Sequence, residues 1–140
     1  MQARYTASAT ATGDGRDGHV RSSDGVLDLD LAVPAEMGGA GGPRTNPEQL
    51  FAAGYAGCFH NALRRVGRRA NVPLTDSAVT VDVGIGPHAS GDGFGLTVLI
   101  EAEIPGADEA TAKDLLEQAH RLCPYSRATR GDVEVTITLA

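Results

Sequence analysis

The sequence is poor in positive charge and has no long apolar run. It has 12 Lys and Arg residues against 18 Asp and Glu, a formal net charge of −6 at pH 7. This balance leaves no basic footprint for a nucleic-acid backbone or an anionic membrane surface. The longest apolar run, residues 50–59, is shorter than the about 20 residues that a bilayer-spanning helix needs. We therefore expect no nucleic-acid partner and no membrane association.

Cysteine is scarce, with two residues in the chain. The amino-terminal end, Met-Gln-Ala-Arg-Tyr-Thr, lacks the apolar stretch of a signal peptide, so we expect a cytoplasmic protein. In a reducing compartment two cysteines seldom form a structural crosslink. They are more often inert core residues, metal ligands or a redox centre, and the rest of the sequence has to distinguish among these.

The length of 140 residues and the 41% hydrophobic composition are typical of one folded domain, here residues 1–140. Apolar side chains that alternate with period two predict strands, and apolar side chains at helical spacing predict helices. We expect an α+β fold with mainly antiparallel strands. The predicted strands cover residues 5–12, 19–22, 27–31, 79–85, 94–104 and 133–139, and the predicted helices begin near residue 47 and span about 108–122.

The first predicted helix has a clear start. Thr45 and Glu48 match a capping box, Asn46 is an alternative cap, and Pro47 suits a first turn. Residues 50–59 are then apolar on all sides, which predicts a helix buried all round. A small sheet covers such a helix poorly. We therefore expect an antiparallel sheet wrapped around this buried central helix in an intertwined homodimer.

Cys58 lies within this apolar helix, and Cys123 follows the second helix on the same face as Leu116. One cysteine in such a setting is typically a small buried apolar residue, but a second inward-facing cysteine favours a redox pair. A nucleophilic Cys58 has to be a thiolate, and burial opposes this unless a cation lies nearby. At about 4 Å a guanidinium contributes about 4 kcal/mol at an effective dielectric of 20.

Arg16, in a glycine-rich loop, is our candidate cation, although a solvated turn residue is an equally good interpretation. A buried arginine needs a carboxylate, and Glu48 is the candidate. Glu48 and Cys58 are ten residues apart on one helix, about 15 Å along its axis. Either the helix bends at Gly54 or Gly57, or Arg16 and Glu48 reach Cys58 from a partner protomer.

Two other function classes are open at this point. A metal site is one, because two cysteines and two histidines are available, but His60 lies two residues from Cys58 and faces away from it on a helix. We therefore expect no metal and no bound cofactor. The other is a non-enzymatic domain that binds a ligand or senses oxidation, in which a disulfide only reports the redox state. The four candidate metal ligands are Cys58, His60, His120 and Cys123.

Four stretches of the sequence resemble the organic hydroperoxide resistance (Ohr) proteins of the OsmC/Ohr family. They are GRDGHVRSSDGVLDL, GGAGGPRTNPEQLFAAGYAGCF, VGIGP and CPYSRATRGDVEVT, and the likeness extends over essentially the whole chain. The resemblance implies a homodimeric α+β fold with active sites at the interface. It also implies reduction of organic hydroperoxides by paired cysteines and recycling by a lipoyl dithiol on a protein.

The same resemblance assigns roles to four residues. Cys58 corresponds to the peroxidatic cysteine and Cys123 to the resolving cysteine, while Arg16 corresponds to the activating arginine and Glu48 to its carboxylate partner. We accordingly expect a cysteine-based peroxidase that acts against organic peroxide stress and forms a Cys58–Cys123 disulfide. Apolar neighbours are expected to favour hydroperoxides with hydrocarbon tails; they are Phe51, Phe59 and Met37.

Overall fold

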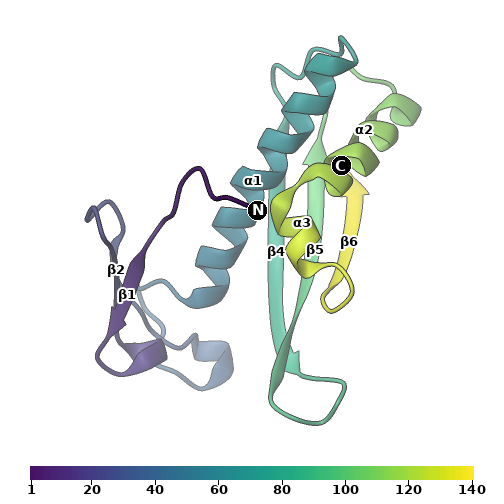
Figure 1. Cartoon of the computed structure of the whole chain (residues 1–140). Helices are drawn as coiled ribbons and strands as arrows, with labels where there is room; N and C mark the ends of the chain where they lie inside the picture. The colour runs from purple at the N-terminus through teal and green to yellow at the C-terminus, as the bar shows by residue number, and fades with distance from the viewer. The chain divides into compact units, whose positions relative to one another are not determined.

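The structure, a computed structural model, describes all residues 1–140 and divides into two compact units, residues 1–50 and residues 51–140. In Figure 1 the first unit runs from purple to blue and the second from teal to yellow. The α+β class expected from the sequence is confirmed. That the two units act as one domain stays a prediction. The elements are β1 (Ala9–Thr12), β2 (His19–Ser22), β3 (Asp28–Asp30), α1 (Pro47–Arg69), β4 (Ala78–Pro87), β5 (Phe94–Glu103), α2 (Glu109–Leu122), α3 (Pro124–Thr129) and β6 (Glu134–Leu139), with single 3-10 turns at Gly15–Asp17 and Ala35–Met37.

The first unit contains a small antiparallel sheet in the order β1-β2-β3. The strand predicted over residues 5–12 begins only at Ala9, because β2 offers it four paired positions, from Ser22 opposite Ala9 to His19 opposite Thr12. β3 is also short and pairs with β2 over three residues. The sheet is therefore small, and residues 13–18 form the loop that joins β1 to β2 at one end of it.

The second unit is built on a sheet in the order β4-β5-β6. β4 and β5 match the strands predicted over residues 79–85 and 94–104. They form a long hairpin, with antiparallel register from Ala78 opposite Glu103 to Pro87 opposite Phe94. We expected mainly antiparallel strands, but β6 pairs with β5 in parallel. Two helices, α2 and α3, separate β5 from β6, and such a crossover returns the chain in its original direction.

One face of α1 fits into the core of the second unit. Its buried apolar residues recur at helical spacing, and Figure 1 shows the helix running alongside the sheet. The sequence predicted burial on all sides, but Ala53 and Gly57 are exposed in the single chain. The sheet, α2 and α3 cover one side of α1 in the single chain, and the cover expected for its other side from a second protomer stays a prediction. The buried residues of this face are Tyr55, Phe59, Ala62, Leu63, Val66 and Gly67.

The helix starts are fixed by side-chain caps. Asn46 caps α1, since its Oδ1 accepts a hydrogen bond of 2.8 Å from the Gln49 backbone N–H. The capping box predicted from Thr45 and Glu48 is therefore wrong, because Glu48 is engaged elsewhere. Asp108 caps α2 in the same way. None of the helices combines the length and the apolar character that a membrane crossing requires.

Candidate active site

The two cysteines lie together in the second unit. The Cys123 thiol donates a hydrogen bond to Cys58 Sγ at 3.7 Å, and neither cysteine is in a disulfide. Cys123 has no exposed surface, whereas Cys58 is partly exposed. The predicted inward orientation of Cys123 is thus confirmed. Two free thiols in contact, one of them open to solvent, have the arrangement from which a reversible disulfide can form.

The position of Cys123 follows from the amphipathic pattern of α2. Ala119 is fully buried one turn earlier, and Cys123 continues that face, with its N–H bonded to the Ala119 carbonyl at 2.8 Å. α2 ends at Leu122, where the sequence predicted its end, and Pro124 follows. Pro124 also begins a further short helix, α3, which the sequence analysis does not predict and in which it occupies the first turn. Cys123 therefore caps two helices at once and is held from both sides.

The Cys58 thiol is not activated within the second unit. Burial, the largest effect, raises the pKa of Cys58 above its ordinary value. A backbone hydrogen bond with Tyr125 opposes this rise in pKa, and the neighbouring Cys123 thiol adds to it. No cationic side chain contributes to the pKa of Cys58. A nucleophilic role for Cys58 therefore requires a positive charge that the second unit does not supply.

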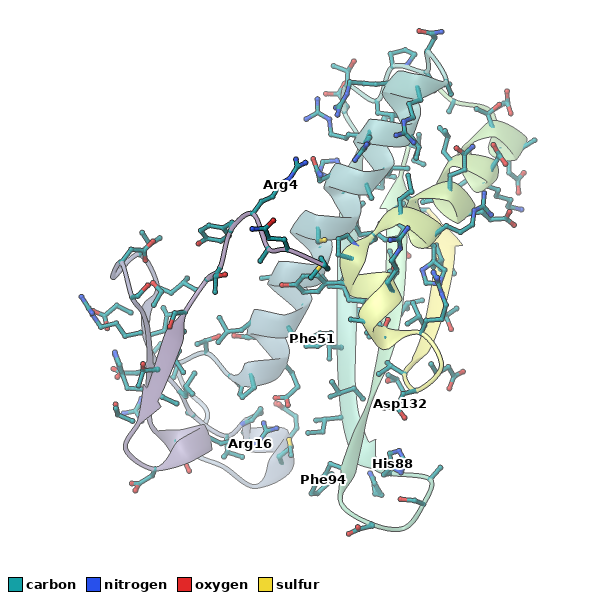
Figure 2. The ribbon with its side chains drawn as sticks, in the orientation of Figure 1. Arg4, Arg16, Phe51, His88, Phe94 and Asp132 are labelled. Carbon is teal, nitrogen blue, oxygen red and sulfur yellow. The ribbon has the colours of Figure 1, made fainter.

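Aromatic rings line the segment next to the cysteines. Phe51, labelled in Figure 2, Tyr55 and Tyr125 contact one another with ring centroids 5.7 to 6.3 Å apart. These distances and the tilted planes are typical of favourable aromatic pairs. Phe59, which we expected beside a substrate, is instead fully buried in the core and cannot line a site. Met37 belongs to the first unit and is exposed.

Arg16 and Glu48 form the second pair, and both lie in the first unit. Arg16 Nη1 and Nη2 donate hydrogen bonds of 2.9 and 2.8 Å to the two carboxylate oxygens of Glu48. This bidentate geometry is the strongest form of such a pair. The hydrogen bond from Arg16 lowers the pKa of the Glu48 carboxyl, and Glu48 in turn raises the pKa of Arg16. The guanidinium is therefore fixed in direction and remains charged.

The loop around Arg16 depends on glycine. Gly13 and Gly15 both have positive φ, 77° and 62°, a region that other residues rarely adopt. The side chain of Arg16, labelled in Figure 2, is 41% exposed, and that of Glu48 is 12% exposed. Arg16 thus keeps part of its guanidinium accessible while Glu48 fixes its fork. An anionic group that approaches this face would find a prepositioned cation.

The two histidines considered as metal ligands have other partners. His60 Nε2 is hydrogen-bonded to Ser77 Oγ at 2.9 Å, and His120 Nδ1 to Ser126 Oγ at 2.9 Å. The structure contains no group of three or more His, Cys, Asp or Glu side chains that could hold a metal ion. The cysteines therefore contact each other and not a shared set of ligands.

Comparison with known proteins places the chain in a family. The model of the family described as OsmC-like protein matches residues 38–138. An organic hydroperoxide resistance protein of Xanthomonas axonopodis pv. citri is 50% identical over 136 residues, which cover 97% of this chain and 94% of that protein. This chain belongs to the OsmC/Ohr family.

Solved structures of the OsmC/Ohr family share the whole fold. An organic hydroperoxide resistance protein from Elizabethkingia anophelis is 49% identical, with a TM-score of 0.93 over 100% of this chain and 99% of the other. A relative from Vibrio cholerae is 46% identical, with a TM-score of 0.91 over 99% and 94% of the two chains. It was solved with captopril bound in one of its active sites.

The four residues singled out in the sequence thus form two pairs, each within one unit. The roles of Arg16, Glu48, Cys58 and Cys123 in a reaction are a proposal, argued below. The sequence interpretation missed the hydroxyl groups beside the cysteines. Tyr55 lies in the stretch 50–59, whose composition predicts a helix that is apolar on all sides. A tyrosine within a stretch otherwise without polar atoms is the signal that could have prompted a search for its hydrogen-bond partner.

Proposed function

We propose that this chain is a cysteine-based peroxidase that reduces organic hydroperoxides to alcohols and so protects against organic peroxide stress. The observation that carries this proposal is the contact of 3.7 Å between the free thiols of Cys58 and Cys123. Relatives at about half identity are named organic hydroperoxide resistance proteins, which supports the substrate class. The cytoplasmic location expected from the sequence is part of this proposal.

The reaction proceeds in two chemical steps. The Cys58 thiolate attacks the distal peroxide oxygen, the O–O bond breaks, and the alkoxide leaves as an alcohol after it takes up a proton. Cys58 becomes a sulfenic acid. The Cys123 thiol then attacks the Cys58 sulfur, water leaves, and a disulfide forms. Cys58 is exposed enough to meet a peroxide, and Cys123 is buried within reach of it, which suits this order of events.

Arg16 supplies the positive charge that Cys58 lacks in its own unit. We assign to Arg16 the stabilisation of the thiolate and of the charge that develops on the departing oxygen, and to Glu48 the orientation of Arg16. Ten helical residues separate Glu48 from Cys58, about 15 Å along a straight helix. The Arg16–Glu48 pair that serves one Cys58 therefore comes from a partner protomer, in a homodimer with active sites at the interface.

The exposed side of α1 supports this homodimer. Ala53 and Gly57 are exposed in the single chain, although the surrounding sequence is apolar. Small residues on an open helix face permit close approach by another chain. Cys58 follows Gly57 directly, so a partner that covers this face also reaches the reactive sulfur.

A lipoyl dithiol on a protein is the proposed reductant, and it returns the disulfide to two thiols by exchange. No bound cofactor takes part. The Vibrio cholerae relative with captopril, a thiol compound, in one of its active sites supports access of small thiols. The ring of Tyr125, two residues after Cys123, contacts the ring of Phe51, and this aromatic pair offers an apolar contact for a hydrocarbon tail of the peroxide.

Peroxide consumption by the full chain, with an alkyl hydroperoxide and dihydrolipoamide, tests the proposal. The wild-type protein should turn over many times, and Cys58→Ser should consume no peroxide. Cys123→Ser, assayed without added thiol, should consume about one equivalent and then stall. Sustained turnover by Cys58→Ser would refute the assignment. A wild-type protein that only becomes oxidised once, without turnover under reductant, would instead indicate the redox-sensing domain.

A further inference from the structure

A chain of buried hydroxyl groups lies beside the two cysteines. Tyr55 Oη is hydrogen-bonded to Ser126 Oγ at 2.8 Å, and Ser126 Oγ is hydrogen-bonded to His120 Nδ1 at 2.9 Å. Tyr55 and Ser126 have no exposed surface. A buried hydroxyl without a hydrogen-bond partner destabilises the fold, so each member depends on the next. The pair is thus a specific polar contact inside an otherwise apolar core.

The position of this pair relates it to both sulfur atoms. Tyr55 lies three residues before Cys58 on α1, and Ser126 lies three residues after Cys123 on α3. Residues three apart on a helix are neighbours on one face. The Tyr55–Ser126 hydrogen bond therefore ties the two cysteine-bearing segments together one turn away from the sulfur contact. In Figure 1, α3 lies beside α1 at this level.

His120 connects the same point to the end of α2. It lies three residues before Cys123, as Ser126 lies three after it, so the His120–Ser126 hydrogen bond closes the bend between α2 and α3. Arg130 holds the other side of this bend, because its Nη2 donates a hydrogen bond of 2.8 Å to the His120 carbonyl. Burial, followed by the charge of Arg130, lowers the pKa of His120, so the imidazole is neutral and Nδ1 can pair with the hydroxyl in either tautomer.

We propose that Tyr55, Ser126 and His120 form a positioning unit that sets the distance between Cys58 and Cys123 and thereby the rate at which the Cys58 sulfenic acid is captured. The inference rests on the proposed function. The sulfur atoms are 3.7 Å apart and must approach to about 2.05 Å as the S–S bond forms and water leaves. A misplacement of about 1 Å can slow such a step by about 10²-fold.

Slow capture has a chemical cost for the protein. A sulfenic acid that waits for its partner thiol can react with a second peroxide molecule to give a sulfinic acid, which thiols do not reduce. The positioning unit therefore favours the disulfide over this loss. None of its three members needs to touch the peroxide, so the first step should depend on it little.

The test compares Tyr55→Phe and Ser126→Ala with Thr129→Val in the full chain. Thr129 is a matched control, because it is a buried hydroxyl of α3 whose two shorter hydrogen bonds, of 3.1 and 3.2 Å, go to the backbone carbonyls of Tyr125 and Ser126 in its own helix. Its hydrogen bond with Tyr55 Oη is the longest, at 3.4 Å. Reduced protein is mixed with one equivalent of tert-butyl hydroperoxide. Peroxide loss reports the first step, and the dimedone adduct of Cys58 and the disulfide, both measured by mass spectrometry after quenching, report the second.

We expect Tyr55→Phe and Ser126→Ala to slow disulfide formation about tenfold or more, with accumulation of sulfenic acid, while the first step changes less than about threefold. The double variant, Tyr55→Phe with Ser126→Ala, should form the disulfide no more slowly than the slower single variant. The reason is that both changes break the same hydrogen bond, between Tyr55 and Ser126. A variant that is merely less stable should slow peroxide loss and disulfide formation alike, so a selective effect on disulfide formation is not explained by lost stability. Unchanged disulfide formation, or equal slowing by Thr129→Val, would overturn the inference.

A second oxidant distinguishes failure of this inference from failure of the proposed function. Diamide converts two thiols to a disulfide through an adduct on the more accessible sulfur, with no peroxide involved. If the wild-type chain does not reduce peroxide, the proposed function fails. Slower closure by diamide in Tyr55→Phe and Ser126→Ala than in Thr129→Val would still support the positioning unit, and equal closure in all three would refute it.

Discussion

The two units of the molecule are stabilised by different means. Nearly all buried apolar residues belong to the second unit; in the first unit only Leu31 and Ala32 are buried, and all four residues of β1 are exposed. The second unit therefore has a core, whereas the first depends on its strand hydrogen bonds and on charged pairs such as Arg16 with Glu48. Partly exposed charged pairs contribute only about 0–1 kcal/mol each.

This difference separates the two halves of the proposed chemistry. The sulfur pair lies in the unit with a well-packed interior, which suits atoms that must meet at a fixed distance. The guanidinium lies in the unit with little burial of its own. Preorganisation in the first unit is therefore local and comes mainly from Glu48.

The largest expected effect concerns the cation. Arg16→Ala should lower peroxidase turnover by about 10²- to 10³-fold, because a guanidinium at about 4 Å stabilises a thiolate by about 4 kcal/mol at an effective dielectric of 20. Steady-state peroxide consumption measures the effect. Arg21→Ala is the matched control, since Arg21 is an exposed arginine of the same unit with only a 4.0 Å contact to Asp28. Turnover within threefold of wild type in Arg16→Ala would exclude Arg16 as the activating group.

A smaller effect is expected in the core of the second unit. A Cβ at Gly67 would lie 2.5 Å from a methyl carbon of Leu74, so Gly67→Ala should lower the free energy of unfolding by about 1–3 kcal/mol. Gly57 on the same helix has no neighbour within 4 Å of such a Cβ. In the monomeric chain, with no partner on that face, Gly57→Ala should leave the stability unchanged or raise it by up to about 1 kcal/mol. Urea unfolding measures both, and equal losses would contradict a core confined to one face of α1.

The smallest expected effect distinguishes the units by pH. Hydrogen bonds with Asp30 and then Asp28 raise the pKa of His19 above its ordinary value. Below about pH 6.5, the ordinary pKa of histidine, the ring is protonated in both states and its full contribution to the stability of the first sheet is present. This contribution is lost as the pH rises through the higher pKa that His19 has in the folded state. Amide hydrogen exchange of residues 19–30, corrected for intrinsic rates, should become faster as the pH rises above the pKa of His19 in the folded state. His19→Gln should remove the dependence, and exchange in the second unit should not change.

The sequence predicted features that depend on local periodicity. The hairpin of β4 and β5 and the inward face of α2 follow from side-chain spacing alone, and both are present. The parallel pairing of β6 depends instead on how far the preceding helices displace the chain. The capping box at Glu48 failed for a similar reason: a residue 32 positions away competes for its carboxylate.

The candidate site was predictable as residue types and not as geometry. The motif resemblance named all four proposed site residues, and the structure shows which of them are in contact. The buried hydroxyl pair had a local signature on one side alone: Tyr55 is a tyrosine on an otherwise apolar helix face, whereas nothing in the sequence around Ser126 marks it as buried. Only the tertiary contact between α1 and α3 brings their oxygens together.

The complete burial of Cys123 has a consequence for the return of the protein to its reduced form. A thiol that arrives from solvent meets Cys58 first, because Cys123 presents no surface to attack. In the proposed cycle the intermediate of reduction is therefore a mixed disulfide on Cys58, from which Cys123 departs as the leaving group into the protein interior. Electrons would then enter at the same sulfur that the proposed oxidant attacks, so a single opening would serve both substrates in turn.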